Sequence, residues 1–292
     1  MRPIWKMVSF IGVMLLCLFL VIILYGLLFG TRQDVGALKV LQALQTIFVF
    51  ILPCLLCACL WDSQPMRYLQ WDKPVKLFPA CWVVGVMLLA IPAINLLSWC
   101  NQQITLPSFL SDLEMWMQAQ EDNAAALTER FIKADTLGVL ALNLLLMALL
   151  PAIGEELCFR GVIQKLLQPM NTASHNGQVS NKAIHISVWV SAILFSAMHL
   201  QFYGFIPRML LGAFFGYLLV WSGSLWLPVL AHFTNNAVVI LFYNLYYMRG
   251  LSADDINTFG TGSTLWAGCL SVILTLSGIW ILYRFYHRRN TL

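Results

Sequence analysis

Six polar residues of types that can perform hydrolysis lie within or beside long apolar runs of this chain. They are Glu155, Glu156, Arg160, His199, His232 and Asn236. Charged and imidazole side chains are costly inside a membrane, so each such residue is a candidate for function. A carboxylate and an imidazole can activate a water molecule, and an amide can donate a hydrogen bond to an oxyanion. These residue types therefore suggest a site that cleaves an amide bond with water.

The spacing of the first three residues separates their roles. Glu156 and Arg160 are four residues apart, so on a helix their side chains meet and neutralise each other. Glu155 is rotated by about 100° from Glu156 and lacks this partner. A carboxylate shielded from water without a paired cation can accept a proton near neutral pH, as a general base must. The alternative is that all three residues form only an ion cluster at the end of a helix.

The polar residues on the three helices are expected at similar depths in the membrane. Glu155 lies about 20 Å from the inner end of its helix and His199 about 22 Å from the inner end of the next, at 1.5 Å per residue. His232 lies about 12 Å from the start of its helix, which is a looser match. Asn236 is four residues after His232 and shares its face. We expect Glu155 and His199 to hold and deprotonate the water, and His232 and Asn236 to donate to the oxyanion. A lone intramembrane histidine can instead be a helix-packing residue.

The composition indicates an all-α polytopic membrane protein, in which we expect the polar residues above to form an intramembrane catalytic cavity. The chain has 292 residues, of which 60% are hydrophobic and 10% are charged, against about 25% charged in soluble domains. Apolar runs long enough to cross a bilayer predict about eight transmembrane helices, at 7–30, 38–61, 80–100, 137–168, 184–203, 206–222, 224–247 and 264–284. We divide the chain into N-terminal spans with an external amphipathic loop (1–136), a catalytic core (137–247) and a last span with a basic tail (248–292).

The distribution of basic residues predicts that both termini are cytoplasmic. The bases expected inside are Arg2, Lys6, Arg67, Lys73, Lys76, Lys165, Lys182, Arg284, Arg288 and Arg289, and those outside are Arg32, Lys39, Arg130, Lys133, Arg208 and Arg249. This pattern explains the net charge of +4 without a nucleic-acid partner. The external loop 101–136 is expected to form an amphipathic helix on the bilayer surface, with a capping box at Ser111 and Glu114; the alternative is a plain solvated loop.

Three motifs occur in a fixed order along the predicted helices. They are EExxxR at Glu155–Arg160, FxxxH at Phe195–His199 and HxxxN at His232–Asn236. In this order they resemble the CPBP family of intramembrane proteases, which includes type II CAAX prenyl endopeptidases and bacteriocin-processing and immunity proteins. The resemblance covers residues 137–247.

The resemblance implies an intramembrane endopeptidase of a bacterial plasma membrane, acting on a membrane-associated or CAAX-like peptide or protein. Glu155 matches the family's essential glutamate, and Glu156 and Arg160 complete its motif. Phe195 is the expected substrate-binding residue beside His199. The expected partners are this substrate and the lipid bilayer, with no nucleic acid.

The sequence is also compatible with other functions. The sequence lacks the GxSG, GxGD and HExxH motifs of other intramembrane proteases. A proton-coupled transporter could use the same glutamates and histidines as a relay, although no inverted repeat is apparent. A non-catalytic membrane scaffold or immunity protein is a further alternative.

The need for a metal also remains open. Glu155, His199 and His232 could be three ligands of a zinc ion in a metalloprotease. We favour a metal-free reaction, because the residue four positions after His232 is Asn236, a poor zinc ligand but a good amide donor.

Overall fold

The computed structural model describes residues 2–170, 180–249 and 258–289. The chain is 84% helical, and no strand occurs among the described residues. Within these described ranges six helices are long and apolar enough to cross a membrane, or seven if one bent pair counts as a span. The predicted fold class, an all-α polytopic membrane protein, is confirmed. The elements are α1 (Pro3–Phe29), α2 (Val35–Gln45), η1 (Thr46–Ile51), α3 (Leu52–Trp61), α4 (Pro65–Tyr68), α5 (Leu77–Leu89), α6 (Ile91–Gln102), η2 (Ser108–Leu110), α7 (Ser111–Ile132), α8 (Leu137–Asn143), η3 (Leu144–Leu149), α9 (Leu150–Glu156), η4 (Leu157–Ile163), α10 (Gln164–Met170), α11 (Asn181–Ala197), α12 (Phe205–Ser222), α13 (Trp226–Met248), η5 (Gly262–Thr264) and α15 (Leu265–Arg289).

Two predicted spans differ from the observed helices. The span expected at 184–203 is α11, which has 17 residues and ends at Ala197 in a turn where Leu200 has a φ of 53°. At 1.5 Å per residue α11 is about 25 Å long, a little short of a hydrocarbon core of about 30 Å. The span expected at 80–100 is divided into α5 and α6, which meet at a bend of 45°. Pro92 follows this bend, and its missing N–H explains the break.

The fourth span is a continuous helical rod from Leu137 to Gln168 that includes two π-helical segments. η3 immediately precedes α9, in which Pro151 occupies the first turn. η4 begins directly after Glu156. Single π turns inside α-helices are frequent at functional sites, because they change the direction in which the following side chains point.

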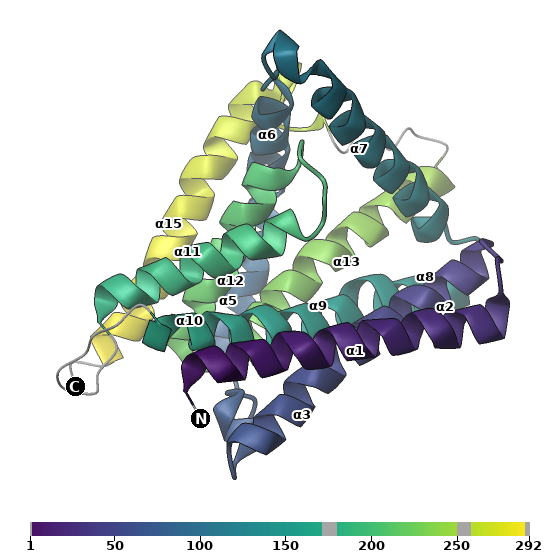
Figure 1. Cartoon of the computed structure of the whole chain (residues 1–292). Coiled ribbons are helices and arrows are strands. Elements are labelled where there is room, and N and C mark those ends of the chain that lie inside the picture. Colours follow the sequence, from purple (N-terminus) through teal and green to yellow (C-terminus); the bar gives the residue numbers. More distant parts are fainter. Residues whose placement is uncertain (1, 171–179, 250–257, 290–292) are drawn as a thin grey trace.

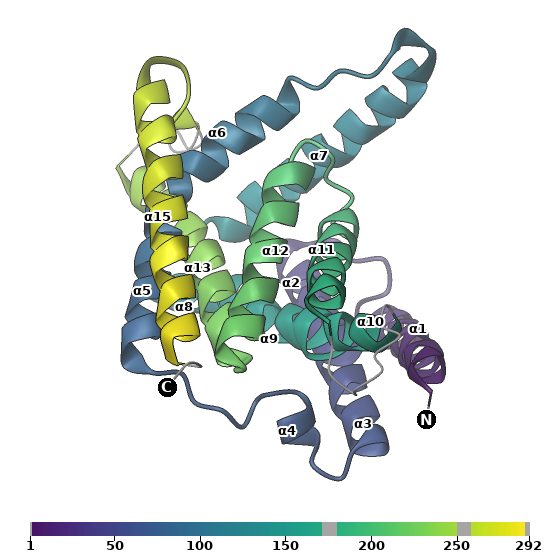
Figure 2. The same ribbon diagram turned by 90° about the vertical axis from the view of Figure 1, so that its left-hand side faces the viewer.

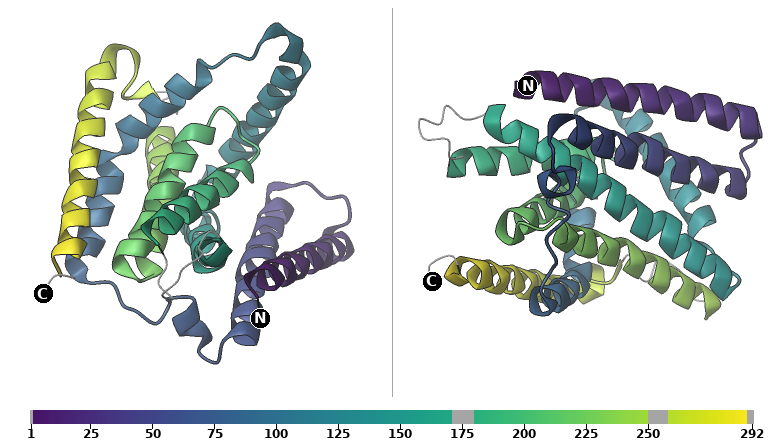
Figure 3. Two further views of the ribbon diagram at one scale, coloured as in Figure 1. Left: turned by 60° about the vertical axis from the view of Figure 1, so that its left-hand side comes forward. Right: turned by 90° about the horizontal axis from the view of Figure 1, so that it is seen from below.

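The helices are arranged in layers around this rod. Viewed from below, α1 lies at one side, followed by α2 and α3, the rod of α8–α10, then α13, with α15 at the opposite side (Figure 3). α9 packs against η1 on one side and against α13 on the other, while α12 lies between α11 and α13 (Figure 1). The glutamates of the rod are thus surrounded by helices from both halves of the chain.

α7 is the amphipathic helix expected in the loop 101–136. It turns back from the far end of α6 and runs along the outside of the bundle (Figure 2). The predicted capping box is wrong: Leu110 precedes the helix without a side-chain cap, and Glu114 Oε1 accepts instead from the Leu106 backbone N–H at 3.4 Å. The short 3₁₀ turn η2 already places Ser111 in helical conformation, so its hydroxyl is not at a cap position.

The carboxyl end of α7 is fixed to the bundle by buried amides. Asn143 and Asn244 both donate to the Ile132 carbonyl, at 2.8 and 3.0 Å, and Lys39 donates to Asn143 Oδ1 at 2.6 Å. Lys39, which the sequence assigned to an external loop, is therefore a buried residue of α2. This network connects α2, α7, α8 and α13 at one end of the molecule.

The orientation in the membrane remains a prediction, and part of the predicted cytoplasmic loop 169–183 lies outside the described residues. We expect the segment between α3 and α5 to be cytoplasmic and α7 to be external, because of the distribution of bases. Ser63 and Gln118 are exposed residues in these two segments. In intact cells a membrane-impermeant thiol reagent should label Gln118→Cys but not Ser63→Cys, on a background without native cysteines. The reverse labelling pattern would show that the orientation is inverted.

Candidate active site

The rod directs its two glutamates to different surroundings. The Glu156 side chain is fully buried, whereas that of Glu155 is 16% exposed and lines a cavity. Arg160 Nη1 donates to Glu156 Oε1 at 3.0 Å, so the predicted i,i+4 pair is present. The π turn of η4 does not disrupt this pair. The two adjacent carboxylates therefore differ in access: one is buried in an ion pair, and the other faces a space where a substrate can enter.

Arg160 lies behind the cavity and connects the rod to α12. Its Nη2 donates to the Gly212 carbonyl at 2.7 Å, and its guanidinium lies 4.6 Å from the centre of the Phe195 ring. A Cβ at Gly212 would lie 3.2 Å from Nη2 and 3.1 Å from Phe195 Cδ1, so only glycine allows this close approach without adjustment. Arg160 therefore holds Glu156 and Phe195 in position and does not itself line the cavity.

His232 is oriented by Glu156. Its Nδ1 lies 2.8 Å from Glu156 Oε1, and its ring stacks on Phe215 with centroids 5.3 Å apart. Because Glu156 is paired with Arg160 and acts as an acceptor, Nδ1 carries the proton. The opposite ring nitrogen, Nε2, lies 3.9 Å from Glu155 Oε2. This distance is too long for a direct hydrogen bond but suits a shared small molecule between the two groups.

His199 is oriented by its own backbone. It lies in the turn after α11, and its Nδ1 is 2.8 Å from the Phe195 carbonyl oxygen. A carbonyl only accepts, so Nδ1 must carry the proton, and in the neutral ring Nε2 is an acceptor. The Phe195 ring packs edge-on against both imidazoles, with centroids 5.1 Å from His199 and 5.8 Å from His232. Phe195 thus fixes the separation of the two histidines.

The amide of Asn236 is oriented by its neighbour. Asn235 Nδ2 donates to Asn236 Oδ1 at 3.2 Å, which leaves the Asn236 Nδ2 group as a donor. Asn236 and His232 are one turn apart on α13 and line the same cavity. Asn236 therefore presents hydrogen-bond donors beside the two imidazoles.

A cavity of about 260 Å³ brings the predicted residues together. Its lining includes Glu155, Phe195, His199, His232 and Asn236. Glu156 and Arg160 do not line it and act on it through other residues. The lining also includes polar residues to which sequence reasoning gave no role, among them Arg208 and Asn235. Arg208 is a charged residue within the predicted span 206–222, which was a signal for function, although it was expected in an external loop.

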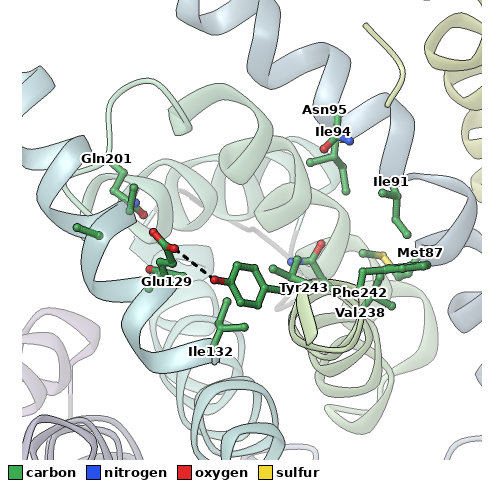
Figure 4. A pocket seen from close by; sticks show the side chains of 15 residues that line it. Met87, Ile91, Ile94, Asn95, Glu129, Ile132, Gln201, Val238, Phe242 and Tyr243 are labelled. Carbon is green, nitrogen blue, oxygen red and sulfur yellow. Dashed lines mark hydrogen bonds between the residues drawn. The ribbon is translucent and has the colours of Figure 1, made fainter. Parts of the chain in front are cut away.

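A larger cavity of about 570 Å³ adjoins the first and shares Ile94, Asn235 and Val239 with it. Figure 4 shows apolar side chains such as Met87 and Phe242 on one side of it, and Glu129 on the other. The Tyr243 hydroxyl donates to Glu129 Oε1 at 3.4 Å. The combined space runs between α5–α6, α7 and α13, and suits a long, mainly apolar group.

The proposed zinc ligands do not form a ligating group. Within residues 2–170, 180–249 and 258–289, no three His, Cys, Asp or Glu side chains are grouped closely enough to hold a metal ion. The structure does not fit the alternative in which Glu155, His199 and His232 hold zinc. The preference for a metal-free reaction stays a prediction.

Comparison with known proteins gives a family match over the part of the chain that holds this cavity. A family model described as Type II CAAX prenyl endopeptidase Rce1-like matches residues 137–238. The chain is also similar to a protein of Bacillus subtilis (strain 168) described as Uncharacterized protein YpbD, with 28% identity over 117 residues. The match covers 39% of the chain and 52% of the relative, so the chain spans about half the length of the curated relative. No solved structure matches the chain significantly.

Proposed function

We propose that the chain is an intramembrane endopeptidase, because residues 137–238 match a family model described as Type II CAAX prenyl endopeptidase Rce1-like. Its substrate is a membrane-associated or CAAX-like peptide or protein. The chain's multi-pass membrane fold suits such a substrate, because the scissile bond then lies close to the membrane in which the enzyme sits.

The observation that carries this proposal is the position of the Glu155 carboxylate. Its Oε2 atom is buried, has no hydrogen-bond partner among the described residues, and faces His232 Nε2. An unpaired acceptor is costly in a buried site. Several buried side-chain atoms of the described residues lack a partner, and among their residues Glu155 is the one that lines this cavity. A water that donates one proton to Glu155 Oε2 and the other to His199 Nε2 satisfies this acceptor.

The groups that would contact the water and the substrate in this reaction all line the cavity. Glu155 takes a proton from the water while the water oxygen attacks the carbonyl carbon of the scissile peptide bond. A tetrahedral oxyanion forms. His199 Nε2 accepts from the water and orients it. When the C–N bond breaks, Glu155 returns the proton to the leaving nitrogen, so that one water is consumed for each bond cleaved.

His232 and Asn236 stabilise the oxyanion. Asn236 donates from Nδ2, which the hydrogen bond from Asn235 leaves available. His232 already donates from Nδ1 to Glu156, so a second donation from Nε2 requires the imidazolium form. The buried Glu156 carboxylate stabilises this cation, as a carboxylate does for the histidine of a catalytic triad.

The larger cavity accommodates the apolar part of the substrate. Most of its lining side chains are apolar, and they come from α5, α6, α7 and α13. Burial of apolar surface contributes roughly 25 cal/mol per Å². A lipid chain or a row of apolar side chains in this cavity brings the neighbouring peptide bond to Glu155.

The purified full-length chain, reconstituted in detergent or liposomes, should cleave members of a pool of membrane-anchored peptides. Mass spectrometry identifies the products. A His199→Asn chain, which removes the imidazole Nε2 acceptor, should cleave at least about 100-fold more slowly. The transporter and scaffold alternatives instead predict no products with either chain. An unchanged rate in His199→Asn would refute the assignment of the site.

A further inference from the structure

Arg208 lines the same cavity as Glu155, yet it belongs to none of the three motifs. It lies in the first turn of α12, half-buried, beside Gly204 and Pro207 in the cavity wall. Nothing in the proposed reaction uses a cation at this place. A guanidinium inside a membrane protein is costly and is kept where it meets an anion.

The guanidinium is held in one position. Gln201 accepts two hydrogen bonds from the guanidinium. Its side-chain Oε1 lies 2.7 Å from Nη2, and its backbone carbonyl oxygen lies 3.4 Å from Nη1. Gly204 lies so close that a Cβ there would be 3.2 Å from Nη2. Arginine has five N–H donors, so the contacts with Gln201 leave donors for another acceptor. The Arg208 guanidinium is therefore pre-positioned at the cavity wall.

Two carboxylates are near Arg208, but neither is paired with it. The ion pairs within the described residues join Glu156 to Arg160, and His232 to Glu155 and Glu156. Glu121 on α7 and Glu155 interact with Arg208 electrostatically. Burial raises the pKa of the Glu121 carboxyl, while a backbone hydrogen bond from Tyr203 and the charge of Arg208 oppose this. Neither carboxylate occupies the bidentate position on the guanidinium.

We propose that Arg208 binds a carboxylate of the substrate and thereby fixes which peptide bond reaches Glu155. This inference rests on the proposed endopeptidase function. A planar guanidinium matches a carboxylate through two parallel hydrogen bonds, and this geometry adds specificity as well as affinity. Arg208 is thus a specificity-determining residue outside the family motifs.

The size of the cavity limits where this carboxylate can be. About 260 Å³ is below the usual range of about 300–1,000 Å³ for ligand pockets. The cavity therefore holds only a short length of chain next to the scissile bond. The carboxylate is either the C-terminal one, a few residues after the cleaved bond, or that of an acidic side chain beside it.

Matched peptides separate these two sources. One ends in a free carboxylate, one ends in an amide, and one ends in an amide but carries Asp beside the scissile bond. The parent chain should cleave the peptide whose carboxylate meets Arg208 with about 10- to 100-fold higher kcat/KM than the plain amide. Preference for the first peptide assigns the C-terminal carboxylate, and preference for the third assigns the side chain.

Arg208→Gln should abolish this preference while leaving the rate on the plain amide within about threefold of the parent. Arg208→Lys keeps the positive charge but loses the planar guanidinium with its paired donors. It should retain part of the preference, which would show that the loss in Arg208→Gln is not caused by misfolding. Arg130→Gln, which removes an exposed guanidinium from α7, should behave as the parent. An equal loss on all three peptides would indicate a structural role, and no loss on any would exclude a role in recognition; both overturn the inference.

A binding measurement separates this inference from the proposed function. In the Glu155→Gln background the three peptides are titrated without turnover. The favoured carboxylate peptide should bind at least tenfold more tightly than the amide, and Arg208→Gln should remove the difference. If the parent cleaves none of the peptides but this binding preference is intact, the proposed endopeptidase function is wrong and the role of Arg208 in binding a carboxylate stands. Cleavage by the parent without any preference contradicts the role of Arg208 alone.

Discussion

Replacement of Glu155 by glutamine should yield a folded chain that does not turn over. Glutamine has the shape of glutamate but cannot accept a proton, and loss of a general base costs about 100- to 10,000-fold in rate. The Glu155 side chain makes no hydrogen bond from Oε2 and contacts His232 only at 3.9 Å. Few folded-state interactions are therefore lost, and the thermal stability in detergent should stay close to that of the parent.

The matched control for Glu155→Gln is Glu129→Gln. Glu129 lines the adjoining cavity, and its Oε1 accepts from Tyr243, a contact that glutamine can keep. This variant removes a carboxylate near the substrate path and should retain most of the activity. If the Glu155→Gln chain cleaves substrate as fast as the parent, Glu155 is not the base and the mechanism must be abandoned.

Much of the fold could be predicted from the sequence, because lipid requires every backbone polar group to be satisfied within a helix. The rod was predicted as 137–168 and is observed as Leu137–Gln168. The end of α11 was not predicted, since it depends on a single turn at Leu200 with positive φ, which the residue type does not signal. The bend at Pro92 had a visible cause in the sequence, but proline inside an apolar run does not reveal whether the helix bends or continues.

Contacts of the site within one helix could be predicted from the sequence, whereas contacts between helices could not. Glu156 and Arg160 are one turn apart on one rod, so their pairing followed from the spacing. The contact between His232 and Glu156 was not predicted, because it depends on how α13 is rotated about its axis relative to α9. Arg208 was not predicted as a site residue, because it lies near the boundary of the predicted span 206–222 and was assigned to the external loop.

Replacement of Glu156 by glutamine should destabilise the protein far more than replacement of Glu155. Arg160 and His232 both approach the same oxygen of Glu156, and Arg160 is fully buried. Glutamine keeps an acceptor at that place but removes the negative charge. Leaving a buried cation without its partner costs about 3–5 kcal/mol. The yield of folded protein and its unfolding temperature, measured by size-exclusion chromatography after heating, should both fall clearly below those of Glu155→Gln.

The double variant Glu156→Gln/Arg160→Met separates lost charge balance from lost packing. It removes the uncompensated cation and fills its place with an apolar chain, so it should recover part of the stability lost in Glu156→Gln. It should nevertheless remain impaired in catalysis, because His232 no longer has a carboxylate to stabilise its imidazolium form. A double variant that is less stable than the single one would show that the guanidinium contacts with Gly212 and Phe195 matter more than its charge. Equal stability of Glu156→Gln and the parent would show that the Glu156–Arg160 pair does not hold the site together.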